Sequence, residues 1–102
     1  METSIRNNTE QSRYELLVGE EDVAGVVEYR DKGDLVELRH TEVDQSYEGE
    51  GLGSQLARAV LDNLRNEKRA IIPSCQFINS YLKRHPEYAD LVPGDRRGEF
   101  GL

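Results

Sequence analysis

Strand-like patterns fill the first half of the chain. Short runs rich in β-branched, aromatic and other apolar residues are separated by polar turns at Glu20-Glu21-Asp22 and Asp31-Lys32-Gly33-Asp34, and Gly33 can supply a positive φ. These runs predict antiparallel strands joined as hairpins, at Tyr14–Gly19, Val23–Arg30 and Leu35–Val43. Residues 1–12 are polar and unpatterned, which predicts a flexible start with a short edge strand near Ile5.

The hydrophobic period changes at Leu52. Apolar residues then recur every four positions, which predicts an amphipathic helix, at Leu52, Leu56, Val60 and Leu64. The run Arg69–Pro73 predicts a short buried strand, and the order strand, helix, strand requires a parallel pair with a right-handed crossover. A second helical repeat ends at Pro86 and comprises Phe77, Ile78, Tyr81, Leu82 and His85.

Together these elements predict an α/β (α+β) fold in which antiparallel N-terminal strands form a mixed sheet with a βαβ unit, followed by a C-terminal helix. A length of 102 residues suits one small domain, which we assign to residues 13–92. Residues 1–12 are expected to be flexible. Residues 93–102, with one proline, three glycines and two arginines, are expected to form a mobile tail.

The net charge of the chain restricts the classes of molecule that it is expected to bind. The chain has 20 acidic and 13 basic residues and a formal net charge of -7, which argues against nucleic acid and favours a cationic acceptor such as an amine. A purely solubilising role for this charge is an equal alternative. A single cysteine excludes an internal disulfide and fits a cytoplasmic location, and no membrane span, export leader or metal is expected. We expect a monomer or a homodimer.

The clearest indication of function in the sequence is a glycine-rich turn between the third strand and the first helix. Three glycines at every second position, Gly49, Gly51 and Gly53, allow a sharp turn whose N–H groups point one way. The helix that follows adds unpaired N–H groups and a positive dipole end. This combination predicts a binding site for an anion, most naturally a phosphate group.

Two common nucleotide-binding patterns do not fit this turn. The dinucleotide fingerprint needs G-x-G-x-x-G and an acidic residue about 20 positions later, but the glycine spacing here differs and Arg69 occupies the later position. The phosphate-binding loop of nucleotidases needs a Gly-Lys pair, and the sequence contains none.

The turn instead resembles the coenzyme A loop of the GCN5-related N-acetyltransferases, whose pattern is V-x-x-x-x-[QR]-x-x-G-x-[GA]. Val43, Gly51 and Gly53 match it, and Glu48 takes the Gln/Arg position. Short, single-domain members of that superfamily are also similar in three flanking blocks, over residues 8–92 in all: His40-Thr41-Glu42-Val43, Ile71-Ile72-Pro73-Ser74-Cys75 and Tyr81-Leu82-Lys83-Arg84-His85-Pro86-Glu87-Tyr88.

This resemblance implies acetyl-CoA as co-substrate and an amine as acceptor. Asn79 and Ser80 are candidates for the pantetheine arm and Lys83 and Arg84 for the 3′-phosphate, or all four equally form a solvated face. The residues that the resemblance places at the cofactor are Val43, Glu48, Gly49, Glu50, Gly51, Leu52, Gly53 and Ser54. It also implies that a backbone N–H near Val43 donates to the oxyanion. The carboxylates of Glu48 and Glu50 weaken a phosphate site unless they point to solvent.

Candidate catalytic residues lie in the flanking blocks. His40 is the first candidate for general base or substrate contact, with a hydrogen-bonded core histidine as the alternative, and strand alternation places it on the face of Val36, Leu38 and Glu42. Glu42 is expected to orient His40 or act through water, or else to be a solvated carboxylate. Cys75, at the first turn of a helix that favours thiolate, is expected to approach His40 for proton transfer or covalent acetyl transfer, or to be inert.

Tyr81 and Tyr88 are candidates for protonating the leaving thiolate, with core packing as the alternative for Tyr81. The resulting hypothesis is an acetyl-CoA-dependent N-acetyltransferase with direct attack by the amine. The alternatives are a coenzyme A-binding or interaction module without turnover, and a partner-binding domain without a cofactor.

Overall fold

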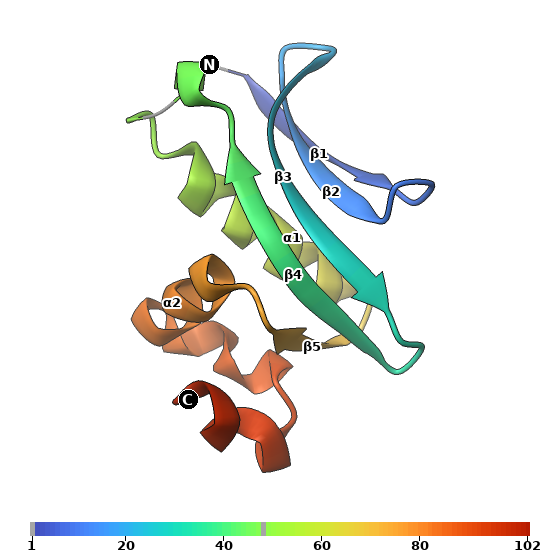
Figure 1. Cartoon of the computed structure of the whole chain (residues 1–102), viewed down its shortest axis with the longest axis vertical. Helices are drawn as coiled ribbons and strands as arrows, with labels where there is room; N and C mark the ends of the chain where they lie inside the picture. The colour runs from blue at the N-terminus through green and yellow to red at the C-terminus, as the bar shows by residue number, and fades with distance from the viewer. Residues whose placement is uncertain (1, 48) are drawn as a thin grey trace.

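The protein folds into a mixed β-sheet that packs against helices. The computed structural model describes residues 2–47 and 49–102, and across them a five-stranded sheet has the order β1-β2-β3-β4-β5. The first strands are antiparallel neighbours with the bounds β1 Thr3–Asn8, β2 Arg13–Val18, β3 Asp22–Asp31 and β4 Leu35–Val43. This arrangement confirms the predicted fold class and the hairpins of the N-terminal half (Figure 1).

The predicted βαβ unit is also confirmed. Helix α1, Leu52–Asn66, connects β4 to β5, Ala70–Pro73, and β5 pairs with β4 in parallel. The buried residues of α1 lie on one face at helical spacing, as the sequence pattern predicts: Leu52, Leu56, Ala57, Val60, Leu61 and Leu64. Lys68 follows the helix with a φ of 58°, and this left-handed residue turns the chain back into β5.

Helix α2, Gln76–Arg84, packs on the same side of the sheet as α1. Tyr81 and Leu82 of α2 belong to the core cluster that also contains Leu56 and Val60 of α1. Figure 1 shows α1 behind the sheet and α2 beside β4, while the described residues place no helix in front of β1 to β4. One face of the sheet is therefore covered by helices, and the other face is open.

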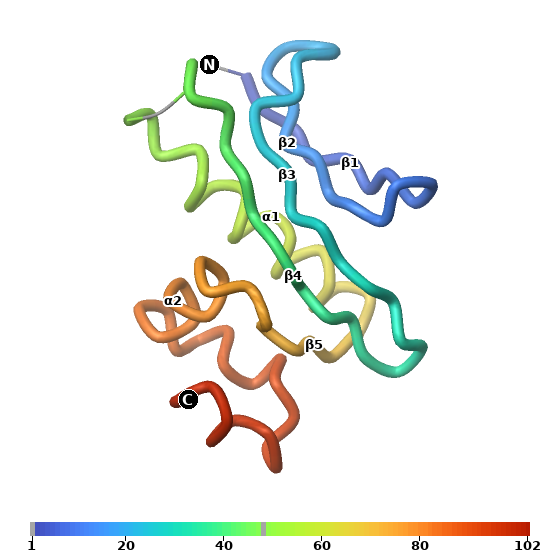
Figure 2. Tube along the Cα trace, viewed as in Figure 1, coloured from blue at the N-terminus to red at the C-terminus, as the bar shows by residue number. Residues whose placement is uncertain are grey.

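Both ends of the chain carry regular structure where the sequence suggests flexibility. Strand β1 pairs with β2 along its whole length, with Ile5 opposite Leu16. After α2, the segments η2 (Pro86–Leu91) and η3 (Gly94–Phe100) form 3-10 turns, and Phe100 and Leu102 pack against the core. Figure 2 shows this C-terminal segment folded back beneath α2. Apolar residues at the end of the chain thus hold this segment against the core, although its glycines and proline predict a mobile tail.

Two shifts in strand register determine which side chains face the helices. Leu16 pairs with Gly25 and Leu17 with Val23, which leaves Ala24 as an extra residue in β3. Glu28 pairs with His40 and Tyr29 with Leu38, which leaves Arg39 as an extra residue in β4. An extra residue exchanges the faces of every side chain that follows it, so each shift changes the alternation predicted from the sequence.

The open face has its own buried centre. Glu15 is 1% exposed and accepts hydrogen bonds from Arg6 Nε at 2.8 Å, Arg13 Nε at 2.8 Å and Asn8 Nδ2 at 3.2 Å. Burial alone raises the pKa of this carboxyl, but the hydrogen bonds from Arg6, Arg13 and Asn8 outweigh it and lower the pKa to about 2. The long arginine side chains therefore cover a part of the sheet over which residues 2–47 and 49–102 place no helix.

Candidate functional site

The glycine-rich turn has the backbone geometry that an anion site needs. Gly49 and Gly51 have φ values of 85° and 73°, a region in which residues with a Cβ are strained. Gly51 is the N-cap of α1, so no side chain caps this end of the helix, and its first turn contains no acidic residue. The Gln55 N–H donates to Gly51 O at 3.2 Å. The preceding N–H groups, from Leu52 to Ser54, have no acceptor within the helix.

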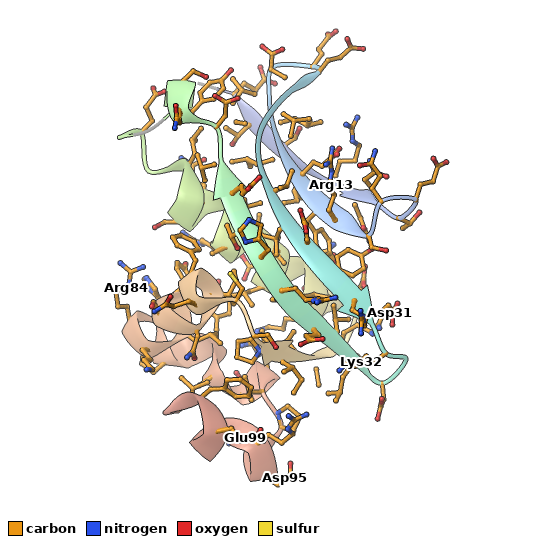
Figure 3. The ribbon with its side chains drawn as sticks, in the orientation of Figure 1. Arg13, Asp31, Lys32, Arg84, Asp95 and Glu99 are labelled. Atoms are coloured by element: carbon orange, nitrogen blue, oxygen red, sulfur yellow. The ribbon has the colours of Figure 1, made fainter. Side chains whose placement is uncertain are left out.

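A groove of ≈ 300 Å³ runs along this turn. Its walls come from the end of β4, the turn, the start of α1 and both ends of α2, and they comprise Val43, Tyr47, Gly49, Gly51, Leu52, Gly53, Ser54, Phe77 and Arg84. A Cβ on Gly53 would lie 3.0 Å from Phe77 Cζ, so a glycine here lets the first turn of α1 approach α2 closely. Figure 3 shows Arg84 projecting from α2 on the side of the glycine turn.

Strands β4 and β5 pair only over a short stretch and then part. Their register runs from Leu35 opposite Ala70 to Leu38 opposite Pro73, and the Cys75 N–H then donates to Leu38 O at 2.8 Å. The Asp44 N–H donates to Ala24 O of β3 at 2.7 Å. Because successive N–H groups along a strand point to opposite edges, the Val43 N–H points toward the side of β5 and α2. This is the orientation that a donor to a bound acyl group needs.

Cys75 is buried at the point where the two strands part. Its side chain is 6% exposed, it is the N-cap of α2, and its Sγ lies 3.2 Å from Thr41 Oγ1 in a hydrogen bond. Thr41 is a residue of this site that the sequence analysis does not select. Its only sequence signal is its position between His40 and Glu42, because the register shift that turns it toward Cys75 is invisible in the pattern.

The predicted face of His40 is wrong. The extra residue Arg39 reverses the alternation of β4, so Thr41 and Val43 face the helices together with Val36 and Leu38, whereas His40 and Glu42 face the open side. The His40 side chain is 54% exposed, and its Nε2 lies 3.1 Å from Glu42 Oε1. His40 and Cys75 thus lie on opposite faces of β4, and the expected Cys–His pair does not form. The expected pairing of His40 with Glu42 is present.

The tyrosine candidates belong to the packing between α1 and the C-terminal segment. Tyr81 is 3% exposed and stacks on His85 with ring centroids 4.1 Å apart, and burial raises the pKa of its phenol. The Tyr88 phenol donates to Asp62 Oδ1 of α1 at 2.6 Å, which together with burial raises the pKa of Tyr88 to about 12. Neither tyrosine lines the groove.

The remaining predicted cofactor residues lie in different surroundings. Glu50 and Ser54 are exposed beside the turn, while the Leu52 side chain is part of the core. Asn79, one helical turn after Cys75, has a buried Oδ1 with no hydrogen-bond partner among the described residues. Lys83 lies against Gly101 rather than in the groove, and Ser80 is exposed. Glu48 lies outside the described residues.

Residues 13–91 match the family described as GCN5-related N-acetyl-transferase. Among curated proteins, the chain is similar to protein NATD1 from Gallus gallus and Homo sapiens, with 38% identity over 52 residues in both cases. Protein NATD1 from Danio rerio is 32% identical over 59 residues. The matches cover 51%, 51% and 56% of this chain and 47%, 46% and 54% of those proteins, so the chain spans about half the length of the curated relatives it matches.

The fold has a counterpart among solved structures. A GCN5-like protein from Staphylococcus aureus, determined by NMR in solution, superposes with a TM-score of 0.65 and 25% identity, covering 89% of this chain and 88% of that protein. Because the family match extends over most of the chain, this protein belongs to the GCN5-related N-acetyltransferase family. Among the described residues, no helix is long and apolar enough to cross a membrane, and no three potential metal ligands cluster together.

Proposed function

We propose that this protein is an acetyl-CoA-dependent N-acetyltransferase that transfers an acetyl group to an amine. The observation that carries this proposal is the groove in which the uncapped start of α1 lies beside Arg84. Coenzyme A carries a pyrophosphate and a 3′-phosphate, and both helix N-termini and arginine side chains bind phosphate groups. Membership of the acetyltransferase family supports the same ligand.

The space around the glycine-rich turn supports this co-substrate. A Cβ at Gly49 or Gly51 would meet no atom within 4 Å, so open space borders the turn where a phosphate would approach the backbone. The exposed Glu50 carboxylate works against phosphate binding, and this effect is reduced by salt.

The chemistry divides among residues on the two faces of β4. As the amine nitrogen forms a bond to the thioester carbonyl carbon, the ammonium loses a proton, the C–S bond breaks and the departing thiolate takes up a proton. His40, held by Glu42 on the open face, accepts the proton from the amine. The Val43 N–H donates to the carbonyl oxygen, and the Cys75 thiol, hydrogen-bonded to Thr41, supplies the proton for the departing thiolate.

A second candidate function is coenzyme A binding without turnover. The separation of His40 from Cys75 across β4 favours it, because these two described residues do not form a nucleophile–base pair. Both candidates use the same groove, so turnover rather than binding distinguishes them.

Calorimetric titration with acetyl-CoA tests the proposal first. We expect saturable binding below millimolar concentrations, and an absence of binding would refute both candidate functions. Thiol release in the presence of polyamines, small amines and lysine-bearing peptides then measures turnover. No release with any amine would leave coenzyme A binding alone.

His40→Ala is expected to lower kcat/KM about 100-fold, because the amine loses its base. Glu28→Gln is the matched control, since Glu28 pairs with His40 in register and lies exposed on the same face. Cys75→Ala tests the thiol in the same assay. Unchanged rates in both His40→Ala and Cys75→Ala would refute the assignment of these residues and leave the fold and the groove unaffected.

A further inference from the structure

A second cavity, of ≈ 550 Å³, lies at the ends of β3 and β4 and is larger than the groove at the glycine turn. Its lining comes from two short runs of neighbouring residues, 23–26 in β3 and 42–45 at the end of β4. Val26 and Glu42 are partners in register, and Glu42 faces the open side of the sheet, so the cavity lies on the face that no helix of the described residues covers. The extra residue Ala24 bends β3 at this point, because a strand bends and twists more strongly where a residue is inserted.

The lining of this cavity combines an apolar floor with negative charge. Val23 and Val26 supply apolar surface, while Glu42 and Asp44 supply carboxylates. Asp44 Oδ1 accepts hydrogen bonds from Ser46 N at 2.9 Å and Ser46 Oγ at 2.6 Å, and these bonds lower the pKa of Asp44. Among the described residues, no lysine or arginine forms an ion pair with either carboxylate, and the side chain beside Glu42 is His40, with Nε2 3.1 Å from Glu42 Oε1. A cation with an apolar stem therefore complements this surface, whereas an anion would be repelled.

The cavity and the groove share one residue. Val43 lines both of them, so only the end of β4 separates the two sites. The His40–Glu42 pair borders the cavity as well, because Glu42 is part of its lining. A transferase with two substrates needs two sites that meet at the reacting atoms, and these sites also need a base on the acceptor side. The cavity lies across one strand from the groove and has His40 beside it, so it is placed for the acceptor if the groove binds acetyl-CoA.

We propose that this cavity is the acceptor site and that it takes a primary alkylammonium group carried on an apolar stem. The inference rests on the proposed function, and it adds the location of the acceptor and its chemical class. The apolar stem lies on Val23 and Val26, the ammonium group is held by the carboxylates of Glu42 and Asp44, and His40 stands beside it to accept the proton. The amine then enters from the open face of the sheet, while the acetyl donor enters from the side of α2.

Titration of the isotope-labelled protein with n-pentylamine, followed by NMR amide shifts without acetyl-CoA, tests this site. We expect saturable shifts that centre on residues 23–26 and 42–45, and we expect 1-pentanol, which has the stem without the charge, to bind at least about fivefold more weakly. Nα-acetyl-lysine methylamide, with its norleucine analogue as the uncharged match, forms a second arm. Binding of either amine in the cavity supports the proposal. Stronger binding of n-pentylamine would indicate a free amine as the acceptor, and stronger binding of the lysine derivative would indicate a lysine side chain.

Variants of the carboxylates sharpen the test. Glu42→Gln is expected to weaken amine binding at least about fivefold, because it removes one of two charges at the cavity. Glu28→Gln, which changes an exposed carboxylate of the same face outside the cavity, is expected to change the affinity less than twofold. The dispersion of the NMR spectrum shows whether each variant is folded.

Each failure has a distinct signature. If neither amine shifts residues 23–26 and 42–45, or if pentanol binds as well as pentylamine, the acceptor site is refuted. Acetyl-CoA added to the same sample reports the groove separately, through the amides of residues 49–54. Shifts there without any response of the cavity would preserve the proposed function and refute this inference alone, whereas unmoved groove amides would refute the proposed function.

Discussion

Individual glycines determine whether the turn before α1 can present its N–H groups. At Gly51, a φ of 73° is the constraint, since a Cβ there would meet no neighbouring atom. At Gly53, the close approach of Phe77 is the constraint instead. The spacing in the sequence does not distinguish these two glycines, but in the structure a different constraint requires glycine at each position.

Gly51→Ala should therefore weaken acetyl-CoA binding about tenfold. Relief of the left-handed strain would rotate the peptide planes of the glycine-rich turn, so that its N–H groups no longer point at the phosphate. Stability should fall by about 1–2 kcal/mol from the same strain. Calorimetric titration and urea unfolding measure the two effects.

Gly33→Ala is the matched control for this substitution. Gly33 has a φ of 87° and open space around it, but it lies at the β3–β4 turn. We expect a similar loss of stability with unchanged acetyl-CoA affinity. Equal losses of affinity in both variants would mean that general destabilisation, and not the glycine-rich turn, controls acetyl-CoA binding.

Glu15 is the residue that should control stability at low pH. Its pKa is about 2 in the folded protein and 4.5 without these contacts, so its contribution is complete above about pH 4.5 and is lost as the pH falls toward 2. Glu15→Gln should cost on the order of 2 kcal/mol at pH 7, and this difference from wild type should shrink at pH 3. Urea unfolding at the two pH values measures it, and a difference that is independent of pH would contradict the assignment.

Among the elements, β4 shows what a sequence pattern can and cannot predict. Its existence, direction and parallel partner follow from the hydrophobic run and from the strand–helix–strand order. The extra residue Arg39 has no signature in the run, because an inserted residue changes the face of later side chains without changing their polarity. The sequence therefore places His40 toward the helices, and the structure places Thr41 there.

The C-terminal segment shows a different reason for the limits of prediction. Glycine and proline mark turns but do not report whether the following apolar residues find a surface to pack on. Here Phe100 and Leu102 reach the core, and Arg97 Nε donates to Ala89 O and Val92 O at 3.2 and 3.0 Å. These long-range contacts depend on the positions of α2 and η2, which no local pattern encodes.

Arg97→Ala should lower the free energy of unfolding by about 1–2 kcal/mol, because it removes the donor that ties η3 to two carbonyl groups of the preceding segment. Arg96→Ala is the control, since the Arg96 side chain pairs with Glu99 in an exposed position and should change stability by less than about 0.5 kcal/mol. Urea unfolding of both variants would contradict this account if their stabilities were equal.

At the scale of the whole molecule, the fold separates the helices from the open face of the sheet. The glycine-rich turn and its helix were predictable from sequence, because glycine spacing and the change of period mark the turn directly. The cavity on the open face was not, since it depends on two register shifts and on residues far apart in the chain. The end of β4 lies between these two sites, and Val43 borders both.

The central claim is that the main-chain N–H groups at the start of α1 bind the phosphates of acetyl-CoA. The most direct measurement is an NMR titration of the labelled protein with acetyl-CoA, read at the amides of Leu52, Gly53 and Ser54. We predict saturable shifts at these amides and at Val43. Amides that stay unmoved at millimolar acetyl-CoA, or shifts confined to other parts of the chain, would contradict the claim.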